Sequence, residues 1–114
     1  RFTESAPTYI ASRDWSKNEA IVIVSRHYDI DRAALAAALT QGGMGYLGMI
    51  GSRRKVLQVY DQMKADGFTS EQLATVYAPL GLDIGADSPA EIAVSVLAEI
   101  LMVLRQKSGR PLKL

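Results

Sequence analysis

The sequence has no cysteine, and this absence narrows the chemistry available to it. It excludes a disulfide framework, a thiolate nucleophile and a metal site with cysteine ligands, and it agrees with a reducing compartment such as the cytoplasm. Neither sign of charge is in excess, because 13 Lys and Arg oppose 12 Asp and Glu. No overall field therefore favours nucleic acid or an anionic membrane as a partner, and any anion site must be local.

Long hydrophobic runs are also missing. The most apolar stretch, Ile92 to Leu104, is interrupted by Ser95 and Glu99 and is shorter than the roughly 20 residues that cross a bilayer. We interpret it as a core helix and expect no membrane association. The chain opens on Arg1 with no signal-like segment, so we expect an excised or processed piece of a longer protein.

What is present is the composition of one soluble domain, with 114 residues of which 48% are hydrophobic. We predict a single domain over residues 1–114, in which residues 1–18 are an extended lead-in and residues 108–114 a tail. Only Thr8-Tyr9-Ile10 could form a short strand in the lead-in. The β-branched run from Ile21 to Val24 is typical of a strand covered on both faces in a parallel sheet.

Strands and helices alternate along the rest of the chain. Asp31 is the predicted N-cap of an alanine-rich helix that stops at Gly42 and Gly43. Residues 46–50 are expected to form a second buried strand and residues 76–78 a short third one. We therefore predict an α/β fold, a partial Rossmann-like parallel sheet of about three strands, flanked by helices and lacking its amino-terminal half. Further predicted helix boundaries are the caps Ser52, Thr69 and Ser88 and the terminating Gly67.

The segment that follows the second strand joins a glycine turn to three consecutive basic residues at the start of a helix. Free backbone N–H groups at a helix N-terminus attract phosphate, and arginine binds phosphate through two hydrogen bonds. Cations in a first turn oppose the helix dipole, so these three need a compensating anion or carboxylate. The alternative is that the serine caps the helix and the basic side chains are solvated. The candidate anion-binding residues are Gly48, Gly51, Ser52, Arg53 and Arg54, followed by Lys55.

A second candidate loop contains Gly81, Asp83 and Gly85 and precedes the last helix. Asp83 could bind a ribose hydroxyl, coordinate an ion or pair with the basic turn, or it could bond its own backbone in a rigid turn. His27 follows the first strand and would lie at the same sheet edge, where it could donate a hydrogen bond to a ligand or order its loop. As the lone histidine it indicates neither a metal site nor a catalytic group.

The last predicted helix is apolar nearly all round, except for a polar stripe at Glu91, Ser95 and Glu99. Such a stripe usually faces solvent. If it faces the domain instead, its carboxylates would need partners, for which Arg53 and Arg54 are the candidates. The apolar remainder needs cover from an upstream half-domain or a partner protein, so we expect a homo-oligomer or domain swapping.

Three segments taken together resemble the carboxyl-terminal domain of the XdhC/CoxI family, the accessory proteins of xanthine dehydrogenase. They run from Tyr46 to Arg54, from Ala78 to Ala86 and from Ser88 to Ile100. The stretch from Ile21 to Asp31 is similar to the strand-His-Asp segment of that family. The likeness thus covers most of the chain between its first predicted strand and the end of its last helix.

This resemblance implies an accessory role rather than catalysis. Members of the family bind molybdenum cofactor, support its sulfuration with a cysteine desulfurase, and deliver it to a molybdenum hydroxylase apoenzyme. The phosphate of molybdopterin suits the turn from Gly51 to Lys55, which is our hypothesis. The Cys-containing domain and the Gly-rich first turn of the family are not in this sequence, so we expect weak anion or nucleotide binding at most from this chain.

Two other interpretations of the sequence stay open. One is a protein-interaction domain that docks a partner through its apolar helix and binds no small molecule. The other is a fragment of a nicotinamide-dependent oxidoreductase that binds NAD(P). The pattern Gly48-x-x-Gly51 argues against the second, because it lacks the three-glycine spacing and the later acidic residue of a dinucleotide fingerprint.

Overall fold

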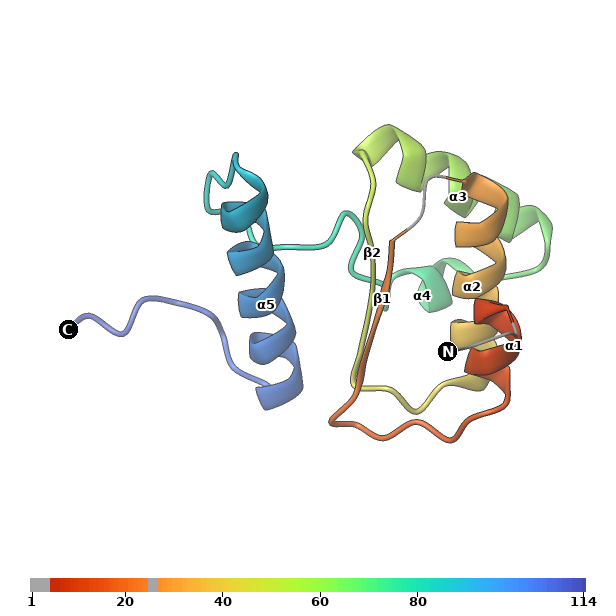
Figure 1. Ribbon diagram of the computed structural model, residues 1–114, viewed down its shortest axis with the longest axis horizontal. Coiled ribbons are helices and arrows are strands. Elements are labelled where there is room, and N and C mark those ends of the chain that lie inside the picture. The colour runs from red at the N-terminus through yellow and green to blue at the C-terminus, as the bar shows by residue number, and fades with distance from the viewer. Residues whose placement is uncertain (1–4, 25–26) are drawn as a thin grey trace.

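The computed structural model describes residues 5–24 and 27–114 and confirms an α/β fold with a parallel sheet. Helices α1, α2 and α3 lie on one side of the sheet and α5 on the other (Figure 1). Within the described residues, no helix combines the length and the hydropathy that a membrane crossing requires. The elements in chain order are α1 (Ala6–Ala11), β1 (Ala20–Ile23), α2 (Tyr28–Gln41), β2 (Tyr46–Met49), α3 (Arg53–Ala65), α4 (Ser70–Leu73) and α5 (Pro89–Arg105).

Among the described residues, the sheet has two hydrogen-bonded strands, β1 and β2, with Val22 opposite Gly48. The third strand predicted at residues 76–78 is reduced to a single parallel bridge between Tyr77 and Gly48. Tyr77 donates its N–H to the Leu47 carbonyl at 2.9 Å, and its own carbonyl accepts from the Met49 N–H at 3.1 Å. Pairing stops there because Pro79 has no N–H to continue the ladder.

The main core fills the space between the sheet and the helices α2 and α3. Strand β1 contributes Ile21 and Ile23 to this core, whereas Val22 and Val24 are 38% and 69% exposed. The prediction that this strand is covered on both faces is therefore wrong, because α5 covers the neighbouring strand and leaves β1 open. The largest fully buried aliphatic side chains of this core are Leu35, Met49, Val59 and Met63.

The segment predicted as an extended lead-in contains the helix α1, so the possible strand at Thr8-Tyr9-Ile10 is wrong. Ser5 caps this helix by accepting from the Thr8 N–H, and a proline in the first turn has the φ that a helix start needs. Ile10 is buried against the core, which holds the helix in place. Residues 1–4 of the predicted lead-in lie outside the described residues.

Most predicted helix boundaries are confirmed, with one correction. Ser52, Thr69 and Ser88 are N-caps, and the last two form capping boxes with Gln72 and Glu91. The prediction that Asp31 is a cap is wrong, because α2 begins at Tyr28, with His27 at the N-cap position. Asp31 lies inside the first turns of α2 and is fully buried.

Candidate functional site

The turn between β2 and α3 leads through a glycine into a serine-capped helix N-terminus, as the sequence predicts. Gly51 has a φ of 152°, a backbone angle that residues other than glycine rarely adopt. Ser52 caps α3 by accepting from the Lys55 N–H at 3.1 Å. The turn thus leads directly from the carboxyl end of a buried strand into the first turn of a helix, where the dipole favours anions.

The three basic residues after this turn divide into two kinds. The Lys55 side chain is 13% exposed and its Nζ lies 2.5 Å from Oδ2 of the fully buried Asp31. The same Nζ lies 5.6 Å from the centre of the Tyr28 ring. Arg53 and Arg54 are exposed, and within residues 5–24 and 27–114 neither has an ion pair. A carboxylate therefore compensates one of the three cations, and the two arginines project toward solvent.

The pair of Asp31 and Lys55 joins the starts of α2 and α3 at this sheet edge. Neither Asp31 oxygen has a hydrogen bond of good geometry within the described residues, so the attraction of Lys55 is what offsets the burial of this carboxyl group. His27 precedes the Tyr28 ring that Lys55 contacts, which places the backbone of this predicted site residue beside the same helix start. No short-range pattern in the sequence could indicate this pair, because its members lie on different helices.

The loop with Gly81, Asp83 and Gly85 also begins at the carboxyl end of β2. The Leu80 N–H donates to the Met49 carbonyl at 3.2 Å, so the loop leaves the sheet next to the basic turn. Gly81 and Gly85 have positive φ values of 107° and 73°, and Asp83 is exposed. Within the described residues, Asp83 makes no ion pair with Arg53 or Arg54. The two loops therefore share this edge of the sheet.

Two of the three residues in the polar stripe of α5 face the domain rather than solvent, whereas Glu91 is exposed and accepts from the Ser88 N–H in the capping box. Ser95 and Glu99 are buried, and Oε1 of Glu99 accepts both from the Tyr46 hydroxyl at 2.7 Å and from the Gly81 N–H at 2.9 Å. The prediction that Arg53 and Arg54 pair with the carboxylates of this stripe is wrong. A tyrosine and a backbone N–H take their place, because Tyr46 projects from β2 toward α5.

Gly48 makes room for this arrangement. It lies inside β2, and a Cβ there would come within 2.7 Å of the Tyr46 ring, which stacks on the Tyr77 ring at 5.0 Å between centroids. Of the predicted ligand residues, Gly48 thus lies against buried side chains, while Gly51, Ser52, Arg53 and Arg54 form the turn itself.

Burial and then the hydrogen bond to Glu99 raise the pKa of Tyr46 well above its usual value. A tyrosine in the unfolded chain ionises near pH ~10, so above that pH the unfolded state loses a proton that the folded state keeps. We expect the free energy of unfolding, measured in urea at increasing pH, to fall above pH ~10. Tyr46→Phe should flatten this decline. The flattening should be incomplete, because burial also raises the pKa of Tyr60. The exposed Tyr28→Phe is the control, and equal slopes in both variants would contradict the assignment.

The XdhC Rossmann domain family matches residues 1–100 of the chain. The chain belongs to this family. It is 37% identical over 106 residues to the uncharacterized protein YqeB of Escherichia coli, covering 93% of this chain and 19% of YqeB. It is 30% identical over 89 residues to a probable xanthine dehydrogenase subunit of Bacillus subtilis, covering 78% of this chain and 24% of that protein. The chain thus spans about a fifth to a quarter of the length of these relatives.

A solved structure shares the fold. The crystal structure of a xanthine dehydrogenase from Bacillus halodurans superposes with a TM-score of 0.70 at 20% identity, over 94% of this chain and 30% of that one. At this identity the likeness concerns the fold alone. It agrees with the partial Rossmann-like architecture described above.

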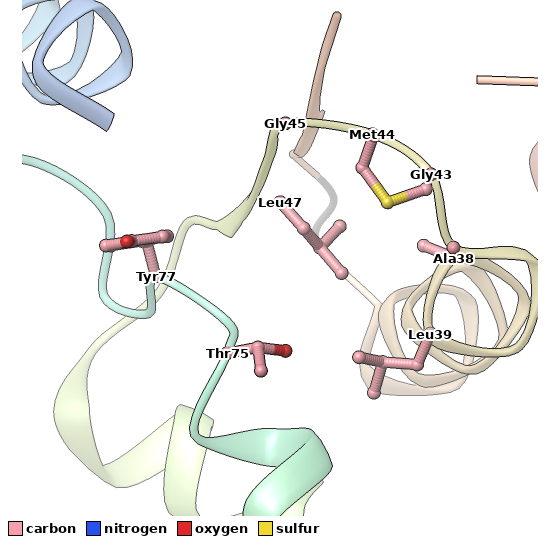
Figure 2. Close-up of a pocket in the computed structure, with 9 residues that line it drawn as sticks. Ala38, Leu39, Gly43, Met44, Gly45, Leu47, Thr75 and Tyr77 are labelled. Carbon is pink, nitrogen blue, oxygen red and sulfur yellow. The ribbon is translucent and has the colours of Figure 1, made fainter. Parts of the chain in front are cut away.

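A hollow of about 420 Å³ at the opposite, amino end of β2 was not foreseen from the sequence. Figure 2 shows Thr75 and Tyr77 on one side of it and the end of α2 on the other. The one available signal was the glycine-rich connection into β2, since Gly42 and Gly43 adopt positive φ values. None of the lining side chains is a cation, so this hollow is a poor match for phosphate. The lining residues are Ala38, Leu39, Gly42, Gly43, Met44, Gly45, Leu47, Thr75 and Tyr77.

Proposed function

We propose that this chain is the phosphate-binding part of an accessory factor for a xanthine dehydrogenase-type molybdenum enzyme, and that it holds molybdenum cofactor at the turn from Gly51 to Arg54. Membership of the XdhC Rossmann domain family supports the accessory role. One relative is described as a probable xanthine dehydrogenase subunit. The observation that carries the ligand site is that Arg53 and Arg54 stand exposed at the positive end of α3, without a carboxylate partner among the described residues.

The turn offers a phosphate group two kinds of interaction, free backbone N–H groups and arginine side chains. Ser52 already accepts from the Lys55 N–H, and its carbonyl accepts from the Val56 N–H. The N–H groups of Arg53 and Arg54 have no such acceptor within the described residues, so they can donate to a phosphate oxygen. The two guanidinium groups add charge-assisted hydrogen bonds. Molybdopterin carries a phosphate, which these groups would bind and orient, whereas the pterin and the metal would lie beyond the turn.

The wider role follows from the family rather than from this site. We propose that the accessory factor binds the cofactor while a cysteine desulfurase sulfurates it, and then passes the cofactor to the apoenzyme in the cytoplasm. This chain itself would catalyse no reaction. The relatives carry most of their length outside the region that this chain matches. Contacts with both partners can therefore involve those further parts.

Titration calorimetry with molybdopterin at low ionic strength tests the ligand site. We expect the double variant Arg53→Ala/Arg54→Ala to weaken binding by about tenfold or more, because each arginine supplies charge-assisted hydrogen bonds to phosphate. The control is Lys64→Ala/Arg110→Ala, which removes the same charge from exposed positions elsewhere. Equal affinity of the two double variants would contradict the site, and NAD binding lost in the arginine variant would favour a dinucleotide ligand instead.

A further inference from the structure

The side of α5 that faces away from the domain is apolar and exposed. Val94, Leu97 and Leu101 have 59%, 61% and 53% of their surface in contact with solvent, and Ala90 is exposed on the same side. The opposite side of the helix presents Ser95 and Glu99 to the domain. This is the reverse of the usual arrangement for a surface helix, in which the apolar stripe faces the core. An exposed apolar stripe of this length marks an interaction surface.

The spacing of these side chains is that of a helix seam. Ala90, Val94, Leu97 and Leu101 follow one another at intervals of four, three and four residues. Alternation of three and four is the pattern that lets side chains of two helices interdigitate along a shared line. We call these four residues the α5 seam. A seam of small and branched residues at this spacing fits another helix with the same pattern, and a second copy of α5 supplies one.

The charges around α5 favour an antiparallel arrangement of such a pair. The chain before and at the start of the helix carries Asp83, Asp87 and Glu91, and no Lys or Arg. From the last turn of the helix onward it carries only basic charges, at Arg105, Lys107, Arg110 and Lys113. Antiparallel pairing sets the acidic start of one helix beside the basic end of the other, whereas parallel pairing would bring like charges together. Antiparallel helix dipoles also attract each other.

We propose that the α5 seam pairs with the seam of a second copy of this chain, with the two helices antiparallel and crossing near Leu97 on a two-fold axis. Leu97 lies close to the middle of α5, so the same surface serves both copies, as a two-fold interface requires. The pair covers the exposed leucines and leaves the turn from Gly51 to Arg54 free. This proposal does not depend on the ligand site, and its tests measure association of the chain and not ligand binding.

Light scattering after gel filtration of the whole chain provides the first test. We expect a dimer, and we expect Leu97→Asp to raise its dissociation constant by about tenfold or more, because a buried charge replaces an apolar contact on both copies. Leu57→Asp is the control, since Leu57 is 56% exposed on α3, away from the seam. A chain that stays monomeric at high micromolar concentration, or a dimer that Leu97→Asp leaves unchanged, would overturn the proposal.

Cross-linking tests the geometry. The chain has no cysteine, so Leu97→Cys introduces a single thiol that lies near the proposed two-fold axis. Two thiols at such an axis can come within disulfide distance. Mild oxidation should therefore link Leu97→Cys rapidly into dimers, at a rate that does not depend on dilution, whereas Leu57→Cys should link slowly. Equal rates for the two variants would show that α5 does not pair across Leu97.

Discussion

Replacement of Lys55 by methionine is expected to lower the free energy of unfolding by about 3 to 5 kcal/mol, because it leaves a fully buried carboxylate without its counter-charge. Asp31 has no solvent contact, and the Lys55 Nζ lies 2.5 Å from its Oδ2. Methionine keeps most of the length of the lysine side chain, so the change removes the charge more than the packing. Urea denaturation followed by circular dichroism measures the loss.

Two further variants separate this ion pair from a general effect of charge. The double variant Asp31→Asn/Lys55→Met should recover a large part of the loss, since no ionised group is then left buried. Arg54→Met removes a charge from an exposed neighbouring position and should change the stability by less than about 1 kcal/mol. If Lys55→Met and Arg54→Met destabilise the chain equally, the buried pair does not hold α2 against α3 as described.

Glu99→Leu is the second change with a large expected effect. Oε1 of Glu99 accepts from two donors, the Tyr46 hydroxyl and the Gly81 N–H, and leucine would leave both without a partner. Each buried donor left unsatisfied costs roughly 1–3 kcal/mol, so the total expected loss for the two donors is about 2 to 6 kcal/mol. Urea denaturation measures it. Glu99→Gln keeps an acceptor oxygen at this position, now that of an amide, and should retain most of the stability.

The pair of Glu99 variants also tests how α5 is attached. The leucine variant should loosen α5 and the loop at Gly81, which hydrogen exchange would record as faster exchange of the amides in that loop. The glutamine variant should leave the exchange unchanged. A leucine variant as stable as the parent would mean that α5 is held by its apolar contacts and not by its polar stripe.

The fold could be predicted where local signals decide it. Residues 46–49 form a buried strand, Gly51 turns the chain, and Ser52, Thr69 and Ser88 cap their helices, all as expected from residue types at short spacing. These features depend on neighbours within a few residues. Their energies are set before the chain folds back on itself, so a single sequence is sufficient to foresee them.

The errors lie where contacts between distant segments decide the outcome. Asp31 has the residue type and position of an N-cap, but Lys55 from another helix draws it into the interior. The stripe of α5 resembles a solvated face, yet Tyr46 reaches Glu99 from a position 53 residues away. The helical period predicts that a helix has two faces, but it does not predict which face meets hydrogen-bond donors from the rest of the domain. Here the donors come from Tyr46 and from the loop at Gly81.

The sequence predicts the turn of the candidate site but not the residues that surround it. The glycine, the serine cap and the arginines lie where the motif placed them. The sequence offered no reason to separate Lys55 from Arg53 and Arg54, because all three are consecutive basic residues. Only the position of Asp31 shows that Lys55 pairs with a buried carboxylate, whereas Arg53 and Arg54 stay exposed.

The most direct test of the ligand site is a titration of the isotope-labelled chain with molybdopterin, followed by the NMR shifts of its backbone amides. We expect the largest changes at the amides of residues 51–55, with smaller ones in the loop at 81–85 that leaves the same end of β2. Changes centred instead on the hollow at residues 42–45 and 75–77, or spread evenly over the exposed lysines, would contradict a phosphate site at the start of α3.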